Sequence, residues 1–250
     1  MTALRIRAVN TAANSENKIH DDRVASQFGF RGGLVPGVTV YGYLAEAVFD
    51  HFGEIWLSRG AMDVRFRQPV YEGEEVEVTV EAEANQRIKV EIAGRASAVA
   101  WVQDESVPAL IELSAPPVAR RAATKNTLAA STILGSLGKR LGRTDSRLSA
   151  PLDAWIGPQR LAHPAILLGL ANEIFVANYE LGPWIHAASE VRKFSVARYC
   201  QQIAVRARIE EEFERNGHDT AVLTVQVLGP YGRLIEHVRH TAIWRPRVVR

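Results

Sequence analysis

The sequence is poor in cysteine, in long apolar runs and in net charge. Its single cysteine, Cys200, excludes an intrachain disulfide framework and a cysteine-only metal site, and favours a reducing compartment. The longest apolar stretch, residues 165–171, is too short to span a bilayer, and residues 1–10 lack the apolar core of a signal peptide. A formal net charge of +2, without basic runs interleaved with aromatics, argues against nucleic acid. We therefore predict a cytoplasmic protein with no membrane and no nucleic-acid partner.

The stretch from Ser15 to Asp50 combines a polar loop, a Gly/Pro-rich turn and an apolar helix. Apolar residues at helical spacing predict a helix over residues 38–50 with one buried face. Pro36 suits a helix start because it has no amide hydrogen to leave unpaired, and Gly37 allows close approach to the backbone. The amides of this first turn form a positive patch that stabilises a developing oxyanion. Because His20 lies in the polar run upstream, we expect a general base beside an oxyanion site.

The second half of the chain repeats the first at an offset of 127 positions. The offset aligns Gly42 with Gly169, Glu46 with Glu173, Val64 with Val191, Arg65 with Arg192 and Val78 with Val205. Apolar alternation predicts strands in both halves, and a second helix is expected over residues 164–180. We predict two copies of one α+β unit, residues 1–115 and 129–250, joined by a Pro-containing connector at 116–128. The expected strands are residues 4–9, 61–70, 76–80, 88–92, 96–102, 191–197, 203–209, 221–227 and 234–244.

Two segments of the first half carry motifs of a known family. One is Ser15-Glu16-Asn17-Lys18-Ile19-His20-Asp21-Asp22 with Ala25, Phe28-Gly29-Phe30 and Pro36-Gly37; the other is Phe66-Arg67-Gln68-Pro69-Val70-Tyr71-Glu72-Gly73-Glu74-Glu75-Val76. Together they resemble the MaoC-like, or R-specific enoyl-CoA hydratase, branch of the hotdog superfamily, over Ser15 to Val80. The resemblance implies an α+β double hotdog, in which two long helices are each wrapped by an antiparallel sheet and the sheets join edge to edge.

The same resemblance implies an activity and a site. It implies a lyase of fatty acid metabolism that hydrates or dehydrates a 2-enoyl or 3-hydroxyacyl thioester, with His20 as general acid/base and the Gly37 amide as oxyanion donor. Ser15 and Asn17 are expected to orient water or the thioester, and Val38 and Tyr41 to contact substrate. Coenzyme A enters as part of the substrate, and no metal and no redox cofactor is expected. The acyl pocket is expected between the halves of a monomeric pseudo-dimer or of a homodimer of double hotdogs.

The sequence departs from the family pattern at Ser15, where the family has an aspartate. A serine hydroxyl supplies no negative charge to raise the basicity of His20. Either another carboxylate substitutes for it, or the site performs a less demanding reaction such as thioester hydrolysis, or the chain is a non-catalytic acyl-thioester-binding subunit. The substrate's acyl structure, its carrier (coenzyme A or a carrier protein) and the reaction direction stay open. The candidate carboxylates are Glu16, Asp21, Asp22 and Glu46.

The remaining chemical side chains receive structural interpretations. His163, at the second helix start, is expected to be a relic that helps to line a tunnel, and Cys200 is expected to pack in the interior. The other histidines show no metal-ligand spacing, so we interpret them as structural or exposed. A basic cluster is interpreted as a solvated face, with a phosphate of coenzyme A as the less favoured alternative. These histidines are His51, His186, His218, His237 and His240, and the cluster is Lys139, Arg140, Arg143 and Arg147.

Overall fold

The computed structural model describes residues 3–142 and 161–248, so Arg143 and Arg147 of the basic cluster lie outside the described residues. The first half contains one long apolar helix, in which residues 39–48 are all buried. A helix that is buried on every side belongs in the centre of a domain rather than at its surface. The elements of this half are β1 (Leu4–Arg7), η1 (Lys18–His20), α1 (Asp22–Ser26), α2 (Gly37–Phe52), α3 (Glu54–Arg59), β2 (Gly60–Phe66), β3 (Glu75–Ala82), β4 (Ile88–Ile92) and β5 (Ala96–Val102).

The second half has the same plan. Its long helix, α5, begins at Pro164, which is favoured at the first position of a helix. Strand β11 is buried along nearly its whole length, in contrast to the alternating burial of β3. Its elements are β7 (Leu137–Arg140), α5 (Pro164–Asn178), β9 (Ile185–Lys193), β10 (Gln202–Arg215), β11 (His218–Leu228), η2 (Pro230–Gly232) and β12 (Leu234–Arg245), and a short parallel pair joins β6 (Arg121–Ala122) to β8 (Tyr179–Glu180).

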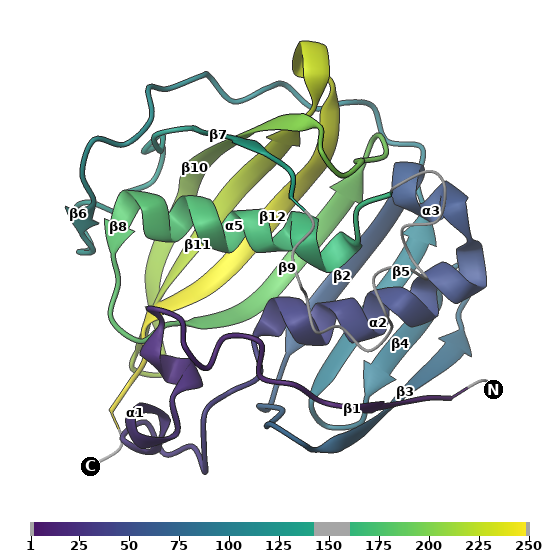
Figure 1. Cartoon of the computed structure of the whole chain (residues 1–250), viewed down its shortest axis with the longest axis horizontal. Helices are drawn as coiled ribbons and strands as arrows, with labels where there is room; N and C mark the ends of the chain where they lie inside the picture. The colour runs from purple at the N-terminus through teal and green to yellow at the C-terminus, as the bar shows by residue number, and fades with distance from the viewer. Residues whose placement is uncertain (1–2, 143–160, 249–250) are drawn as a thin grey trace.

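The two halves share one antiparallel sheet. Its strand order is β1-β3-β4-β5-β2-β9-β12-β11-β10-β7, and the halves meet where β2 pairs with β9, from Ala61 opposite Arg192 to Arg65 opposite Ala188. Helices α2 and α5 contact each other on the same face of this sheet (Figure 1). Their buried side chains and those of the sheet form one continuous apolar core across the junction. The predicted double hotdog, with its sheets joined edge to edge, is therefore confirmed.

The offset of the sequence repeat recurs in the structure. The starts of α2 and α5, Gly37 and Pro164, differ by 127 positions, as do the starts of β3 and β10, Glu75 and Gln202. The strand expected at residues 191–197 instead occupies Ile185–Lys193. Its first half was missed because inward-facing polar residues break the apolar alternation there. The exact boundaries proposed for the two units and their connector stay a prediction.

One pair of charges is buried inside the second half of the sheet. Lys193 Nζ lies 2.6 Å from Glu236 Oε2, and the two side chains are only 2% and 0% exposed. Lys193 also lies 5.3 Å from the centre of the Trp56 ring, which packs from the first half. In the repeat, Lys193 occupies the position of Phe66.

Among the described residues no helix is both long enough and apolar enough to cross a membrane.

Candidate active site

Asn17 fixes the polar loop of the first half to the second half. Its side-chain Oδ1 caps η1 by accepting from the Ile19 amide, 3.3 Å away, as expected of an N-cap asparagine. The same side chain donates to the Trp184 carbonyl at 2.9 Å and accepts from the Trp184 amide at 3.1 Å. Asn17 thus links residues that are far apart in the sequence, and the loop that carries His20 is held against the start of β9.

His20 is oriented as a neutral base. Its Nδ1 donates to the Leu34 carbonyl at 2.7 Å, which leaves the lone pair of the neutral ring on Nε2. Asn17 Nδ2 lies 3.4 Å from that Nε2. Burial lowers the pKa of His20, and the Leu34 carbonyl only partly offsets this effect. The backbone of His20 is also packed closely, because a Cβ at Gly33 would lie 2.1 Å from the His20 carbonyl oxygen.

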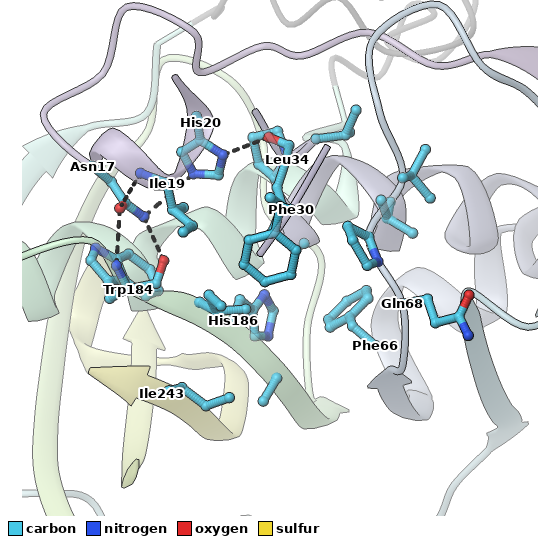
Figure 2. Close-up of a pocket in the computed structure, with 18 of the residues that line it drawn as sticks. Asn17, Ile19, His20, Phe30, Leu34, Phe66, Gln68, Trp184, His186 and Ile243 are labelled. Atoms are coloured by element: carbon cyan, nitrogen blue, oxygen red, sulfur yellow. Dashed lines mark hydrogen bonds between the residues drawn. The ribbon is translucent and has the colours of Figure 1, made fainter. Parts of the chain in front are cut away.

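An apolar cavity of about 250 Å³ opens beside His20, between the two halves. Figure 2 shows His20 and Asn17 on one side of it, and Trp184, His186 and Ile243 on the side of the second half. Phe30 and Phe66 supply aromatic walls. A mainly apolar pocket with a few convergent polar groups is the usual form of a small-molecule site. The other lining residues are Ile19, Leu34, Val35, Pro36, Gly37, Val40, Arg67, Gln68, Pro69, Val70, Asn172, Ile185, Ala187 and His218.

Gly37 lies in the wall of this cavity at the start of α2. Pro36 precedes it as N-cap and offers no side-chain hydrogen bond to the first turn. The Pro36 carbonyl accepts from the amides of Thr39 and Val40, whereas the amides of Gly37 and Val38 have no acceptor within the described residues. A Cβ at Gly37 would lie 2.8 Å from His186 Nδ1, so only glycine fits at this contact. The helix start therefore supplies both unpaired amides and a close approach.

Three other predicted site residues are placed outside the cavity lining. Ser15 Oγ donates to the Asn17 carbonyl at 3.3 Å, so the hydroxyl supports the loop. Tyr41 is fully buried, and burial raises the pKa of its hydroxyl well above the usual value. Val38 packs against the apolar core. The structure therefore brings His20, Asn17 and Gly37 together around the cavity, but not Ser15, Val38 or Tyr41.

No aspartate or glutamate lines the cavity in the part of the chain that the structure describes. Glu16 forms an exposed ion pair with Arg120. Asp21 caps α1 through the Val24 amide, and Asp22 accepts from the Gly33 amide at 2.7 Å. The fourth candidate, Glu46, contacts His163 at the start of the second helix. All four carboxylates proposed as substitutes for the missing aspartate are thus engaged outside the cavity.

His163 and Glu46 form a buried contact away from the cavity. His163 Nδ1 accepts from the Ala165 amide at 3.1 Å and so caps α5. Its Nε2 lies 3.5 Å from Glu46 Oε1, with both side chains almost fully buried. Burial lowers the pKa of His163, and Glu46 acts in the opposite direction. His163 was expected to help line a tunnel, but it is absent from the cavity lining.

The second half contributes residues that sequence reasoning did not assign to the site. His186 packs edge-on against Phe66, with ring centres 4.7 Å apart, and lines the cavity with Trp184 and Asn172. No motif marks these residues, because their positions depend on pairing between strands that are distant in the sequence. In residues 3–142 and 161–248 no three His, Cys, Asp or Glu side chains are grouped so as to hold a metal ion.

Comparisons with known proteins agree with this architecture. Residues 14–103 match the model of the MaoC-like domain family. A solved structure described as a MaoC domain dehydratase from Chloroflexus aurantiacus covers 98% of this chain, with 95% of its own length, at 10% identity and a TM-score of 0.61. A double-hotdog protein from Mycobacterium tuberculosis covers 97% of this chain and 95% of its own, at 11% identity and a TM-score of 0.63.

A third similar structure is described as a thioesterase rather than a dehydratase. It is described as an oleoyl thioesterase from Lactobacillus plantarum, and it covers 98% of this chain and 96% of its own at 12% identity, with a TM-score of 0.53. No curated protein sequence matches the chain. At such low identities the solved structures establish the fold alone, and the match to the MaoC-like domain model is confined to residues 14–103. This chain is therefore a double-hotdog protein whose first half contains a segment, residues 14–103, that matches the MaoC-like domain family.

Proposed function

We propose that this protein is a hydro-lyase that interconverts a 2-enoyl thioester and its 3-hydroxyacyl counterpart. The observation that carries the proposal is the position of His20 Nε2. This unprotonated ring nitrogen belongs to a residue of the cavity wall, and the same wall contains the Gly37 helix start. A base and an oxyanion site around one apolar pocket suit addition of water next to a thioester carbonyl. The matched MaoC-like segment supports the same reaction class.

In the hydration direction one group can serve both proton transfers. His20 Nε2 removes a proton from water as the water oxygen bonds to C3 of the enoyl chain. The electron pair of the C2–C3 double bond moves toward the thioester oxygen, which the Gly37 amide stabilises. The protonated His20 then returns its proton to C2, and the carbonyl re-forms. Dehydration is the reverse, and neither direction requires a carboxylate at Ser15.

The test is turnover of crotonyl-CoA and of a longer 2-enoyl-CoA by the wild type and by His20→Asn. The Asn amide nitrogen can occupy the place of Nδ1 and keep the hydrogen bond to the Leu34 carbonyl, but it has no base at the Nε2 position. We expect a loss of about 10²- to 10⁴-fold, the range for a positioned acid–base group. His51→Asn, at an exposed position of α2, is the matched control and should be unchanged. Equal rates for wild type and His20→Asn would refute the proposal.

The pH profile gives an independent check. Because burial lowers the pKa of His20, the ring is neutral at pH 7, and kcat/KM should fall only below the ordinary histidine value of 6.5. An acid limb centred above pH 6.5 would contradict His20 as the base.

Because none of the described residues that line the cavity is a carboxylate, two alternatives are measured in the same assay. Release of free coenzyme A from a saturated acyl-CoA would identify a thioesterase. Saturable binding without turnover would identify a non-catalytic acyl-thioester-binding subunit. We favour the hydro-lyase because the pocket holds a neutral base and an oxyanion site together.

A further inference from the structure

A β-bulge in β9 places two polar residues on the inner face of the sheet. Opposite β12, Thr241 pairs with Ala188 and Ala242 pairs with His186, so Ala187 is an extra residue in β9. In a regular strand, residues three apart point to opposite faces. Here the extra residue brings both His186 and Ser189 inward, where they are 6% and 1% exposed. Bulges frequently re-aim side chains next to functional sites.

The bulge creates a buried hydrogen-bonded chain of three side chains. His186 Nε2 lies 2.8 Å from Ser189 Oγ, which lies 3.1 Å from His240 Nδ1. The centres of the two histidine rings lie 4.3 Å apart, and the ring planes are tilted by 37°. These hydrogen bonds engage one nitrogen of His186, Nε2, and leave the other, Nδ1, buried without a hydrogen-bond partner among the described residues. An unsatisfied polar atom in the interior costs free energy, so its position calls for a function.

The free Nδ1 lies directly beside the helix start. A Cβ on Gly37 would lie 2.8 Å from it, and both residues belong to the cavity wall. Figure 2 shows the His186 ring beside Phe30 and Phe66, on the wall opposite His20. Because Nδ1 itself has almost no accessible surface, a substrate oxygen at the Gly37 amide would meet this edge of the His186 ring only after a small movement of the ring.

The surroundings of His186 keep its ring neutral. Burial lowers its pKa well below the usual value, His240 adds to this effect, and the Ala188 carbonyl opposes it. A neutral imidazole is a hydrogen-bond donor rather than a proton source, and neutral histidines polarise carbonyl groups in other enzymes. When His240 Nδ1–H donates to Ser189 Oγ, the serine hydroxyl donates to His186 Nε2, and the proton of His186 then resides on Nδ1.

We propose that His186 Nδ1–H and the Gly37 amide together bind the thioester oxygen, so that the oxyanion site is assembled from both halves of the chain. The inference rests on the function proposed above and extends it. His186 contributes the second donor, and Ser189 and His240 act as positioning residues that fix its tautomer. Enolate charge then develops between two donors in a mainly apolar pocket, where such donors act more strongly than in water.

Three variants separate the nitrogen beside Gly37 from the rest of the ring. His186→Gln can keep a polar group near Ser189 but has no donor at the Nδ1 position, and we expect kcat on crotonyl-CoA to fall about 10²- to 10³-fold. His186→Asn places its amide nitrogen near the Nδ1 position and should retain activity within about tenfold of wild type. Ser189→Ala removes the tautomer restraint and should lower kcat by an intermediate factor with little change in KM. His51→Asn is the unaffected control.

A second measurement does not depend on turnover or on small stability differences. Butyryl-CoA labelled with ¹³C at the thioester carbonyl is bound to each folded variant, and the carbonyl stretch is recorded by infrared difference spectroscopy. Binding to wild type should lower the frequency through polarisation, and His186→Gln should lose at least half of that shift.

The outcomes distinguish this inference from the proposed function. An unchanged carbonyl shift in His186→Gln, or activity within threefold of wild type while His20→Asn is inactive, would overturn the second donor and leave the hydro-lyase intact. A wild type that binds butyryl-CoA with a His186-dependent shift but converts no substrate would support the donor and refute the hydro-lyase. Failure to bind any acyl-CoA would overturn both.

Discussion

Removal of Lys193 tests how strongly the buried charge pair constrains the fold. In Lys193→Met the carboxylate of Glu236 stays at 0% exposure without its partner, which lies 2.6 Å away in the wild type. Breaking a buried pair in this way costs about 3–5 kcal/mol. For a chain of this size, about 2–4 °C in Tm corresponds to each kcal/mol, so we expect Tm to fall by roughly 6–20 °C. Thermal and urea unfolding followed by circular dichroism measure the loss.

The pH dependence of that loss identifies its cause. Burial already raises the pKa of Glu236 although Lys193 opposes the shift, and the variant removes that opposition. An acid with a raised native pKa holds its proton while the unfolded chain releases it, so stability falls as pH rises above the unfolded value of about 4.5. The deficit of Lys193→Met against wild type should therefore grow from pH 5 to pH 8.

A double variant completes the cycle. Lys193→Met with Glu236→Leu removes both charges at similar volume and should recover most of the lost stability, because neither group is then left unpaired. A single variant that loses less than about 1 kcal/mol, or a deficit that is the same at pH 5 and pH 8, would refute the reasoning.

Three further predictions concern the site and its supports. Gly37→Ala forces a methyl group into a 2.8 Å contact, so it should lower the free energy of unfolding by about 1–3 kcal/mol and also reduce turnover. The matched control, Gly169→Ala in α5, meets nothing within 4 Å and should raise the free energy of unfolding by up to about 1 kcal/mol. Chemical denaturation compares the two variants. Asn17→Ala removes both hydrogen bonds to Trp184 and should destabilise the chain by about 1–3 kcal/mol, which the same titration measures. Burial lowers the pKa of His240 to about 3, so the unfolded chain alone takes up this proton as pH falls below about 6.5. This one group should therefore lower stability at pH 5 by about 2 kcal/mol relative to pH 7.5, in addition to the effect of the other buried histidines, and His240→Leu should remove that share of the decline.

The sequence predicts those features that local chemistry determines. The helix start near Gly37 and the polar loop that carries His20 depend on neighbouring residues, and the structure shows both. The constant repeat offset, which links residues 127 positions apart, also recurs in the structure. The cavity face of the second half was not predictable in the same way. His186 and Ser189 are separated by three positions, a spacing that indicates opposite faces of a strand until a bulge is known to intervene. Likewise, spacing alone could not show that Ser15 turns toward the loop backbone.

The two helix starts differ in a way that determines how many ligands the chain accommodates. The amides at the start of α2 are unpaired in the described structure, whereas His163 caps the start of α5 and Lys193 and Glu236 occupy the sheet of that half. The two repeated units thus differ at the helix start: the first turn of α2 has amides free to bind a ligand, and the first turn of α5 is capped by a side chain. A titration with acyl-CoA should saturate at one equivalent per chain, half the stoichiometry of a symmetric pair of identical units. Under the proposed function the second copy forms a wall of the cavity and does not need catalytic residues of its own.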